Sequence, residues 1–263
     1  MRARRRFGQH FLHDPAAIER IVAALSPGPG DCLVEIGPGR GALTRALLQS
    51  PCRSLDAIEI DRDLAALLRA AFAGERRFAL HEADALRFDF TALARERGRL
   101  RVVGNLPYNI STPLLFHLLR SARALIDLHV MLQREVIERM AAAPGDAAYG
   151  RLTVMLAPWV DVQRLFDVGP GAFQPPPRVW SAVARVSVRS SPAFPVSPAF
   201  AAIVAAAFAH RRKTLRNALR GLVTAAQIEC CGIDPAARPE TLPPAAFNAL
   251  AERARAPIGS SLS

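Results

Sequence analysis

Between residues 32 and 105 the chain repeats one pattern: a short apolar run, then a turn, then a segment with helical periodicity. This alternation predicts parallel strands joined by helices, an α/β fold. One residue closes each apolar run, and these residues follow one another at intervals of 22, 25 and 21 positions: Gly37, Glu59, Asp84 and Asn105. Because successive strand ends share one edge of such a sheet, we expect the four residues to line a ligand site there.

The first junction is a glycine-rich turn in the sequence VEIGPGRGALT. Gly37 and Gly39 belong to a G-x-G-x-G spacing, which differs from the G-x-G-x-x-G fingerprint of dinucleotide-binding proteins and lets backbone lie against a ligand. A turn that only packs a helix is the alternative. Glu59 can accept hydrogen bonds from both ribose hydroxyls. Asp84 can accept from an adenine amine, or it can cap a helix, as we expect of Asp61. Together these junctions favour an adenosine-containing cofactor.

The fourth junction reads GNLPYNISTP and suits chemistry on an exocyclic amine. The lone pair of adenine N6 is conjugated into the ring, so this nitrogen is a poor nucleophile. The side-chain oxygen of Asn105 and the carbonyl of Leu106 can accept both amine hydrogens and favour a pyramidal nitrogen. Pro107 stiffens the loop, and Tyr108 offers a stacking face. An ordinary turn is the alternative. At the end of a fourth strand, this order predicts a site for an adenine flipped out of its stack.

The rest of the chain divides by composition. Residues 124–142 are expected to form a strand that runs into a helix, and residues 152–170 a helix followed by a strand. The proline run in FQPPPRV is expected to be a loop that feeds an alternating strand. Residues 189–198 have the composition of a linker, and helical periodicity follows. The prediction is a domain of residues 1–191 and a small all-helical domain of residues 192–263.

The net charge points to a polyanionic partner. Lys and Arg number 34 against 23 Asp and Glu, which gives a formal net charge of +11 and a pI near 11.0. Helical spacing places Arg212, Arg216 and Arg220 on one stripe, where we expect contact with RNA phosphates. A solvated helix face is the alternative. The full set of candidate RNA-binding residues is Arg211, Arg212, Lys213, Arg216 and Arg220.

The cysteines and the apolar segments exclude several classes of protein. The four cysteines have neither metal-ligand nor disulfide spacing. No apolar stretch has the length of a signal-peptide core or of a membrane span. We therefore expect a cytoplasmic protein with reduced thiols, no metal site and no membrane partner.

The chain resembles the ribosomal RNA adenine dimethyltransferases over essentially its whole length. The resemblance is carried by the blocks RFGQHFLHD, EIGPGRGALT, EIDRDL, ADAL, GNLPYNISTPLLF, LQREVIERM, YGRLTVML, FQPPPRVWSAV and AAAFAHRRKTLRNAL. The last block, with a full helical C-terminal domain, is more similar to the small-subunit branch, linked to kasugamycin sensitivity, than to the erythromycin-resistance methylases.

This resemblance implies a Rossmann-like class I methyltransferase sheet with S-adenosylmethionine as the cofactor. The implied cofactor-binding residues, together with the glycine turn, are His10, Leu12, Gly37, Gly39, Glu59, Asp84 and Asn105. The target adenine is expected between Tyr108 and Phe173. The family usually reads Q-N-F-L where this chain has Q-H-F-L, so His10 is either a replacement ligand or a surface residue.

The implied function is dimethylation of the N6 amines of two adjacent adenosines in a hairpin near the 3′ end of small-subunit rRNA. The implied enzyme is a monomer that acts on the small ribosomal subunit or its precursor. Two alternatives stay open: a large-subunit adenine methylase that confers antibiotic resistance, and a binding factor, such as a ribosome-assembly checkpoint or an organellar transcription factor. The intact N-L-P-Y sequence argues against a purely non-catalytic role, and a second role in ribosome assembly is compatible with it.

Overall fold

The computed structural model describes residues 10–210 and 212–254. Its strands are β1 (Phe11–Leu12), β2 (Cys32–Ile36), β3 (Ser54–Glu59), β4 (Phe78–Glu82), β5 (Leu100–Asn105), β6 (Leu125–Gln133), β7 (Val160–Val168), β8 (Phe173–Gln174) and β9 (Ser181–Val188). Its α-helices are α1 (Pro15–Leu25), α2 (Ala42–Leu48), α3 (Arg62–Ala71), α4 (Phe90–Arg97), α5 (Ser111–Arg120), α6 (Arg134–Ala141), α7 (Arg151–Leu156), α8 (Phe200–Ala207), α9 (Leu215–Ala218), α10 (Ala225–Glu229) and α11 (Pro244–Arg253). Short 3-10 turns are η2 (Ala122–Ala124), η3 (Pro170–Ala172) and η4 (Pro239–Thr241). None of the helices in these ranges is long and apolar enough to span a membrane.

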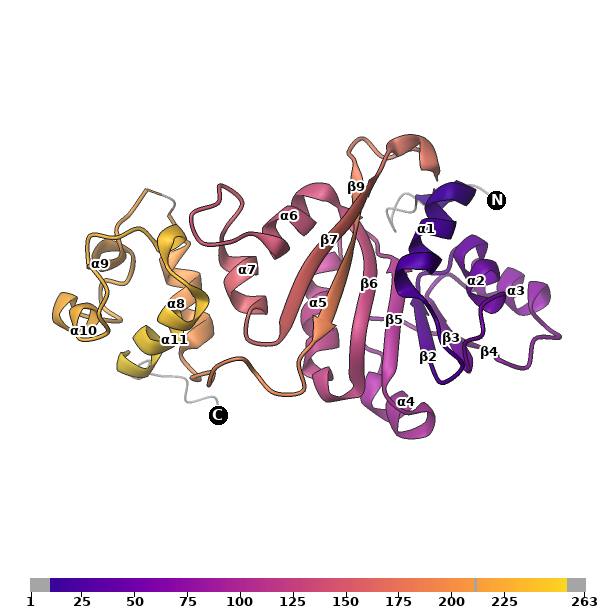
Figure 1. The fold of residues 1–263 in the computed structure, drawn as a ribbon, viewed down its shortest axis with the longest axis horizontal. Coiled ribbons are helices and arrows are strands. Elements are labelled where there is room, and N and C mark those ends of the chain that lie inside the picture. Colours follow the sequence, from indigo (N-terminus) through magenta and orange to yellow (C-terminus); the bar gives the residue numbers. More distant parts are fainter. Residues whose placement is uncertain (1–9, 211, 255–263) are drawn as a thin grey trace. The chain divides into compact units, whose positions relative to one another are not determined.

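Seven strands form one sheet in the order β4-β3-β2-β5-β6-β9-β7 (Figure 1). The strands from β4 to β6 pair in parallel, and β9 runs antiparallel to β6. The expected α/β fold is therefore confirmed. Strand β2 reads CLVEI and is buried throughout, as a central parallel strand between two layers of helices requires.

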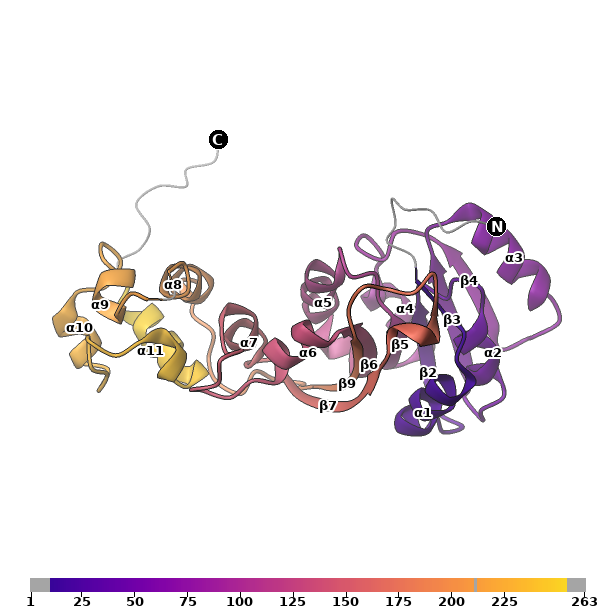
Figure 2. The same cartoon turned by 90° about the horizontal axis from the view of Figure 1, so that it is seen from above.

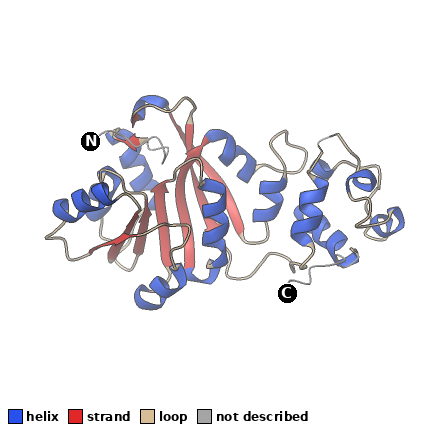
Figure 3. Ribbon diagram, turned by 180° about the vertical axis from the view of Figure 1, so that it is seen from behind, coloured by secondary structure: helices blue, strands red, loops and turns tan. Residues whose placement is uncertain are grey.

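Helices cover both faces of this sheet. Helix α1 lies in front of the sheet in Figure 1, and the view from behind in Figure 3 shows a helix across the opposite face. Asp14 starts α1 by accepting a hydrogen bond from the N–H of Ala16, and Pro15 occupies the first turn, where its missing N–H has no cost. The buried side chains Ile21 of α1 and Leu55 of β3 belong to the core on this face.

A second, two-stranded sheet joins the N-terminal segment to the chain before β9. In it, β1 pairs antiparallel with β8, so that Phe11 lies opposite Gln174 and Leu12 opposite Phe173. Two residues are too few to show any periodicity, so this pairing could not be predicted from the sequence. The pairing brings the segment around His10 to the edge of the main sheet.

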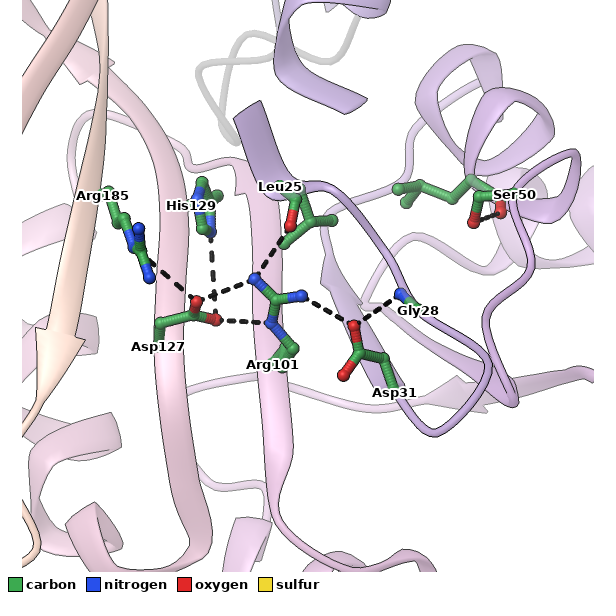
Figure 4. A network of polar contacts seen from close by, with 9 residues as sticks. Leu25, Gly28, Asp31, Ser50, Arg101, Asp127, His129 and Arg185 are labelled. Carbon is green, nitrogen blue, oxygen red and sulfur yellow. Dashed lines mark hydrogen bonds and ion pairs between the residues drawn. The ribbon is translucent and has the colours of Figure 1, made fainter. Parts of the chain in front are cut away.

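An ion-pair network joins neighbouring strands near their amino ends (Figure 4). Arg101 of β5 donates hydrogen bonds to Asp127 of β6 at 2.8 Å and to Asp31 at 2.7 Å. His129 lies beside Asp127, and burial lowers the pKa of His129 and favours its neutral form. Because Arg101 is near the start of β5 and Asn105 ends it, this network holds the strands at the end opposite to the predicted site.

The described residues form two compact units. One contains the chain up to residue 137 and residues 161–190, and the other contains residues 138–160 and the chain from residue 191. The second unit has its own core, in which Tyr149 and Val154 are buried together with side chains of α8, α9 and α11. Contacts thus add residues 138–160 to the helical unit that the sequence predicts from residue 192 (Figure 2).

The helix expected to carry the arginine stripe is interrupted. Helix α8 ends before the basic segment, and α9 is four residues long. The N–H groups of Leu215 and Arg216 donate to carbonyl groups within residues 235–237, so they are not available to continue a helix from α8. The prediction that Arg212, Arg216 and Arg220 lie on one helical stripe is therefore wrong, although all three side chains are exposed.

Candidate functional site

A cavity of about 290 Å³ lies at the carboxyl ends of β2, β3, β4 and β5. One residue from each strand junction lines it, namely Gly37, Glu59, Asp84 and Asn105. The cavity is also lined by further candidates from the sequence: His10, Leu12, Gly39, Leu106, Pro107 and Tyr108. The fold thus brings together residues that are up to almost a hundred positions apart in the sequence. They lie at one edge of the sheet, where open α/β sheets bind ligands.

The glycine turn after β2 adopts a conformation that side chains disfavour. Gly39 has φ +59°, and a β-carbon placed on it would lie 2.9 Å from the ring of Phe11. Its N–H donates to a carboxylate oxygen of Glu59 at 3.2 Å. Glycine is therefore required here for both its backbone angle and its size, and the turn presents bare backbone to the cavity at the start of α2.

Glu59, the last residue of β3, is held by two backbone donors. Its carboxylate accepts from the N–H of Asp61 at 2.9 Å and from that of Gly39 at 3.2 Å. Burial raises the pKa of Glu59, and these two hydrogen bonds oppose that shift. A carboxylate has about four acceptor positions, so two remain for ribose hydroxyls. Asp61 caps α3 by accepting from the N–H groups of Asp63 and Leu64, which confirms its expected role.

Asp89, not Asp84, caps the next helix, α4, and the expected contact of Asp84 with an adenine amine stays a prediction. The carboxylate of Asp84 accepts from the N–H of Leu86 at 2.9 Å and so closes its own turn, and the residue also lines the cavity. Nearby, Ile60 and Ala85 line the same space, and Ile60 is 47 % exposed. These apolar side chains give the cavity walls that suit a planar base.

Glu35 is a cavity residue that the sequence analysis missed. It lies within β2, is 2 % exposed, and accepts a 2.6 Å hydrogen bond from the hydroxyl of Thr44. Burial raises the pKa of Glu35 to about 8, and the negative charge of Glu59 acts in the same direction. A carboxylate inside the apolar run CLVEI was the available signal, because an unpaired charge is rare in a buried strand.

The N-L-P-Y segment begins where β5 passes very close to β2. A β-carbon placed on Gly104 would lie 2.4 Å from the carbonyl oxygen of Ile36, so only glycine allows this approach. Asn105 follows, and its side-chain N–H donates to the carbonyl of His10 at 2.8 Å. This bond orients the amide. Within residues 10–210 and 212–254 no group donates to the Asn105 side-chain oxygen or to the Leu106 carbonyl, so both remain acceptors.

Tyr108 is held on two sides. Its ring stacks on that of His10, with centroids 5.7 Å apart and planes at 28°. Its hydroxyl shares a 2.6 Å hydrogen bond with the hydroxyl of Ser181, at the start of β9. The Nδ1 atom of His10 donates in turn to the carbonyl of Pro175 at 2.8 Å. His10 is therefore part of the cavity wall, and Ser181 is a site residue that only the fold could bring to Tyr108.

Phe173 does not line the cavity. Its pairing with Leu12 in the small sheet turns the side chain into the core, where it is 2 % exposed. No face of the ring is open to a base in this conformation, so the geometry gives no support to Phe173 as a stacking partner of the target adenine.

The candidate RNA-binding residues belong to the second unit. Arg212, Lys213, Arg216 and Arg220 are exposed, and Arg220 donates to the side chain of Asn217 at 3.2 Å. Arg211 lies outside the described residues. These positions leave the predicted phosphate contacts sterically open.

A mostly parallel sheet with this glycine turn and a buried carboxylate at the ends of neighbouring strands is the fold of a class I S-adenosylmethionine-dependent methyltransferase. The family model described as ribosomal RNA adenine dimethylase matches residues 1–255. This chain belongs to that family.

Relatives and solved structures agree with the family. A protein named Ribosomal RNA small subunit methyltransferase A from Pseudomonas aeruginosa is 52 % identical over 254 residues, which cover 96 % of this chain and 94 % of that protein. A protein of the same name from Nitrosococcus oceani is 56 % identical over 243 residues, 92 % of each chain. The structure of a dimethyladenosine transferase from Plasmodium falciparum is similar with a TM-score of 0.75 and 26 % identity, covering 92 % of this chain and 96 % of that one. The 23S rRNA methyltransferase ErmE is similar with a TM-score of 0.72 and 25 % identity, covering 92 % and 98 %.

Proposed function

We propose that this protein transfers methyl groups from S-adenosylmethionine to the N6 amines of two adjacent adenosines in a hairpin near the 3′ end of small-subunit rRNA. The observation that carries the proposal is the pair of open acceptors, the Asn105 side-chain oxygen and the Leu106 carbonyl, in a cavity that also contains Glu59. Identity of more than half to proteins named for the small subunit, against 25 % to a 23S rRNA methyltransferase, favours the small subunit as the target.

The residues of the cavity fit the adenosine part of the cofactor. Glu59 has acceptor positions left for two ribose hydroxyls, and Ile60 and Ala85 provide apolar walls for the base. The bare backbone at Gly39 lets a ligand approach closely. When bound, the cofactor supplies an electrophilic methyl group carried on a sulfonium.

The chain's own residues position the substrate amine. The Asn105 side-chain oxygen and the Leu106 carbonyl accept hydrogen bonds from the amine, which favours a pyramidal nitrogen with an available lone pair. The amine gives up one hydrogen as a proton to solvent for each methyl group that it receives. Tyr108, fixed by His10 and Ser181, provides an oriented face for the flipped base. Catalysis on this account is mainly positioning, which can contribute several orders of magnitude in rate.

The second unit supplies affinity for RNA. Its exposed cations include the predicted RNA-binding residues Arg212, Lys213, Arg216 and Arg220. Contacts of such residues with phosphates carry no sequence information but hold the substrate in register. We infer a monomeric enzyme of the cytoplasm that acts on the small subunit or its precursor, and a further role in ribosome assembly is compatible with this binding surface.

Methylation of unmodified small subunits tests the proposal. Subunits from a strain that lacks the modification are incubated with the protein and labelled S-adenosylmethionine, and the rRNA is digested to nucleosides. We expect label in N6,N6-dimethyladenosine. No label in dimethyladenosine would reject the proposed function.

A further inference from the structure

A large aromatic side chain lies exposed on the loop that leads into β9, and the catalysis proposed above does not use it. Trp180 is 50 % exposed, and the adjacent Val179 is 43 % exposed. Single exposed apolar side chains are common, but two neighbours, one of them tryptophan, form a patch of the kind found at interaction sites.

The indole of Trp180 is held in place. The backbone carbonyl of Trp180 accepts a hydrogen bond from the backbone N–H of Arg134 at 2.9 Å. A β-carbon placed on Gly169 would lie 3.6 Å from the ring, so the indole packs over bare glycine backbone. One part of the side chain is therefore covered and the other part faces solvent. A flat ring oriented in this way loses little conformational entropy when a ligand binds to it.

Trp180 is the neighbour in sequence of a residue that contacts the site proposed for the target adenine. Ser181, the next residue, shares the 2.6 Å hydrogen bond with the hydroxyl of Tyr108. Consecutive Cα atoms are about 3.8 Å apart, so the backbone of Trp180 lies directly next to the residue that holds Tyr108. Enzymes that flip a base also contact the nucleotides on either side of it, which remain attached through the RNA backbone.

A free cation accompanies the aromatic ring. Arg178 is exposed, and in the described part of the chain no acidic side chain pairs with it. An exposed ring and an available guanidinium two positions apart on one loop are a combination with which proteins bind single-stranded nucleic acid, the ring stacking on a base and the cation contacting phosphate. The net charge of +11 also favours a polyanion over an apolar partner.

We propose that Trp180 stacks on a nucleotide that flanks the target adenine, with Arg178 at the adjoining phosphate. The inference rests on the proposed function, because it takes RNA as the partner. It adds to that function a contact from the methyltransferase sheet itself, separate from the basic residues of the second unit. The loop of residues 174–180 then helps to place the adenosine beside Tyr108.

Tryptophan fluorescence gives a direct test, because the chain contains two tryptophans. In the full-length Trp159→Phe variant, Trp180 is the sole reporter. Stacking of a base on indole quenches its emission, so titration with single-stranded oligoadenylate should quench the fluorescence to a plateau. Emission that stays constant while fluorescence anisotropy shows the labelled oligonucleotide to be bound would overturn the proposal.

Kinetics on unmodified small subunits provide the second arm. Loss of one base-stacking interaction weakens binding by about 5- to 150-fold. Trp180→Ala should therefore lower kcat/KM by that factor, and Trp180→Phe, which keeps an aromatic ring, should retain most of the wild-type kcat/KM. Ile126→Ala is the matched control, since Ile126 is 39 % exposed near the amino end of β6. Wild-type kcat/KM in Trp180→Ala contradicts the inference. Failure of the proposed function is distinguishable, because then the wild-type protein forms no dimethyladenosine.

Discussion

Two buried carboxylates line the cofactor cavity, and burial raises the pKa of both Glu35 and Glu59. For Glu35 the value reaches about 8, against an ordinary value of 4.5. Between these two pH values the folded protein keeps a proton that the unfolded chain releases. The free energy of unfolding must therefore fall as the pH rises through this window. Because Glu35 is neutral in this pH range, the cavity does not contain a second negative charge close to Glu59.

Glu35→Gln should remove this pH dependence. Glutamine has nearly the same size and its oxygen can still accept from the Thr44 hydroxyl. Compared with the variant, the wild-type protein should lose about 1.4 kcal/mol of stability for each pH unit between roughly 5 and 8. Urea unfolding at several pH values measures the difference. If the free energies of unfolding of the wild type and of Glu35→Gln changed in parallel with pH between roughly 5 and 8, Glu35 would be ionised in the folded protein.

At the scale of single elements, the approach of β5 to β2 decides whether the site forms. The β-carbon of alanine at Gly104 would lie 2.4 Å from the Ile36 carbonyl oxygen, in backbone that cannot rotate away. Gly104→Ala should therefore destabilise the protein by about 1–3 kcal/mol and weaken cofactor binding, because the two strands carry the glycine turn and Asn105. Denaturant unfolding and calorimetry measure the two effects.

Gly74→Ala is the matched control for this substitution, since nothing lies within 4 Å of a β-carbon at Gly74. If Gly104→Ala were as stable as Gly74→Ala and bound the cofactor as well, the close approach of β5 to β2 would not be a requirement of the site.

The elements also show what sequence can and cannot predict. The strands from β2 to β5 and the residues at their ends were predictable, because each strand is a local apolar run closed by a turn. The pairing of β1 with β8 was not, since it joins residues more than 160 positions apart through two-residue strands. That pairing buries Phe173, and no periodicity could reveal it. The Ser181 hydroxyl beside Tyr108 was likewise invisible before the fold.

At the scale of the whole molecule, we expect RNA affinity and chemistry to depend on different residues. Replacing Arg212, Arg216 and Arg220 together by alanine should weaken binding to small subunits and flatten its salt dependence. Each phosphate contact that is lost lowers the log–log slope by about 0.7 to 0.9. Binding measured at several salt concentrations gives this slope, and transfer at saturating subunit should stay close to wild type.

A second triple variant controls for net charge alone. Arg62, Arg95 and Arg123 are exposed residues of the first unit, and their replacement by alanine removes the same three charges. This control should keep the wild-type slope. Equal slopes in the two triple variants would assign the effect to overall charge and reject a specific RNA-binding role for the C-terminal cations.

The central claim, that the strand-end cavity holds the adenine amine for transfer, is tested most directly by single-turnover methylation of Asn105→Ala at saturating cofactor and saturating small subunits. Asn109→Ala is the matched control, because Asn109 lines the same cavity but is exposed. By comparison with the loss of other single positioning hydrogen bonds, we predict a rate lower by about 100-fold or more for Asn105→Ala. We predict a wild-type rate for Asn109→Ala. A wild-type rate in Asn105→Ala would contradict the account.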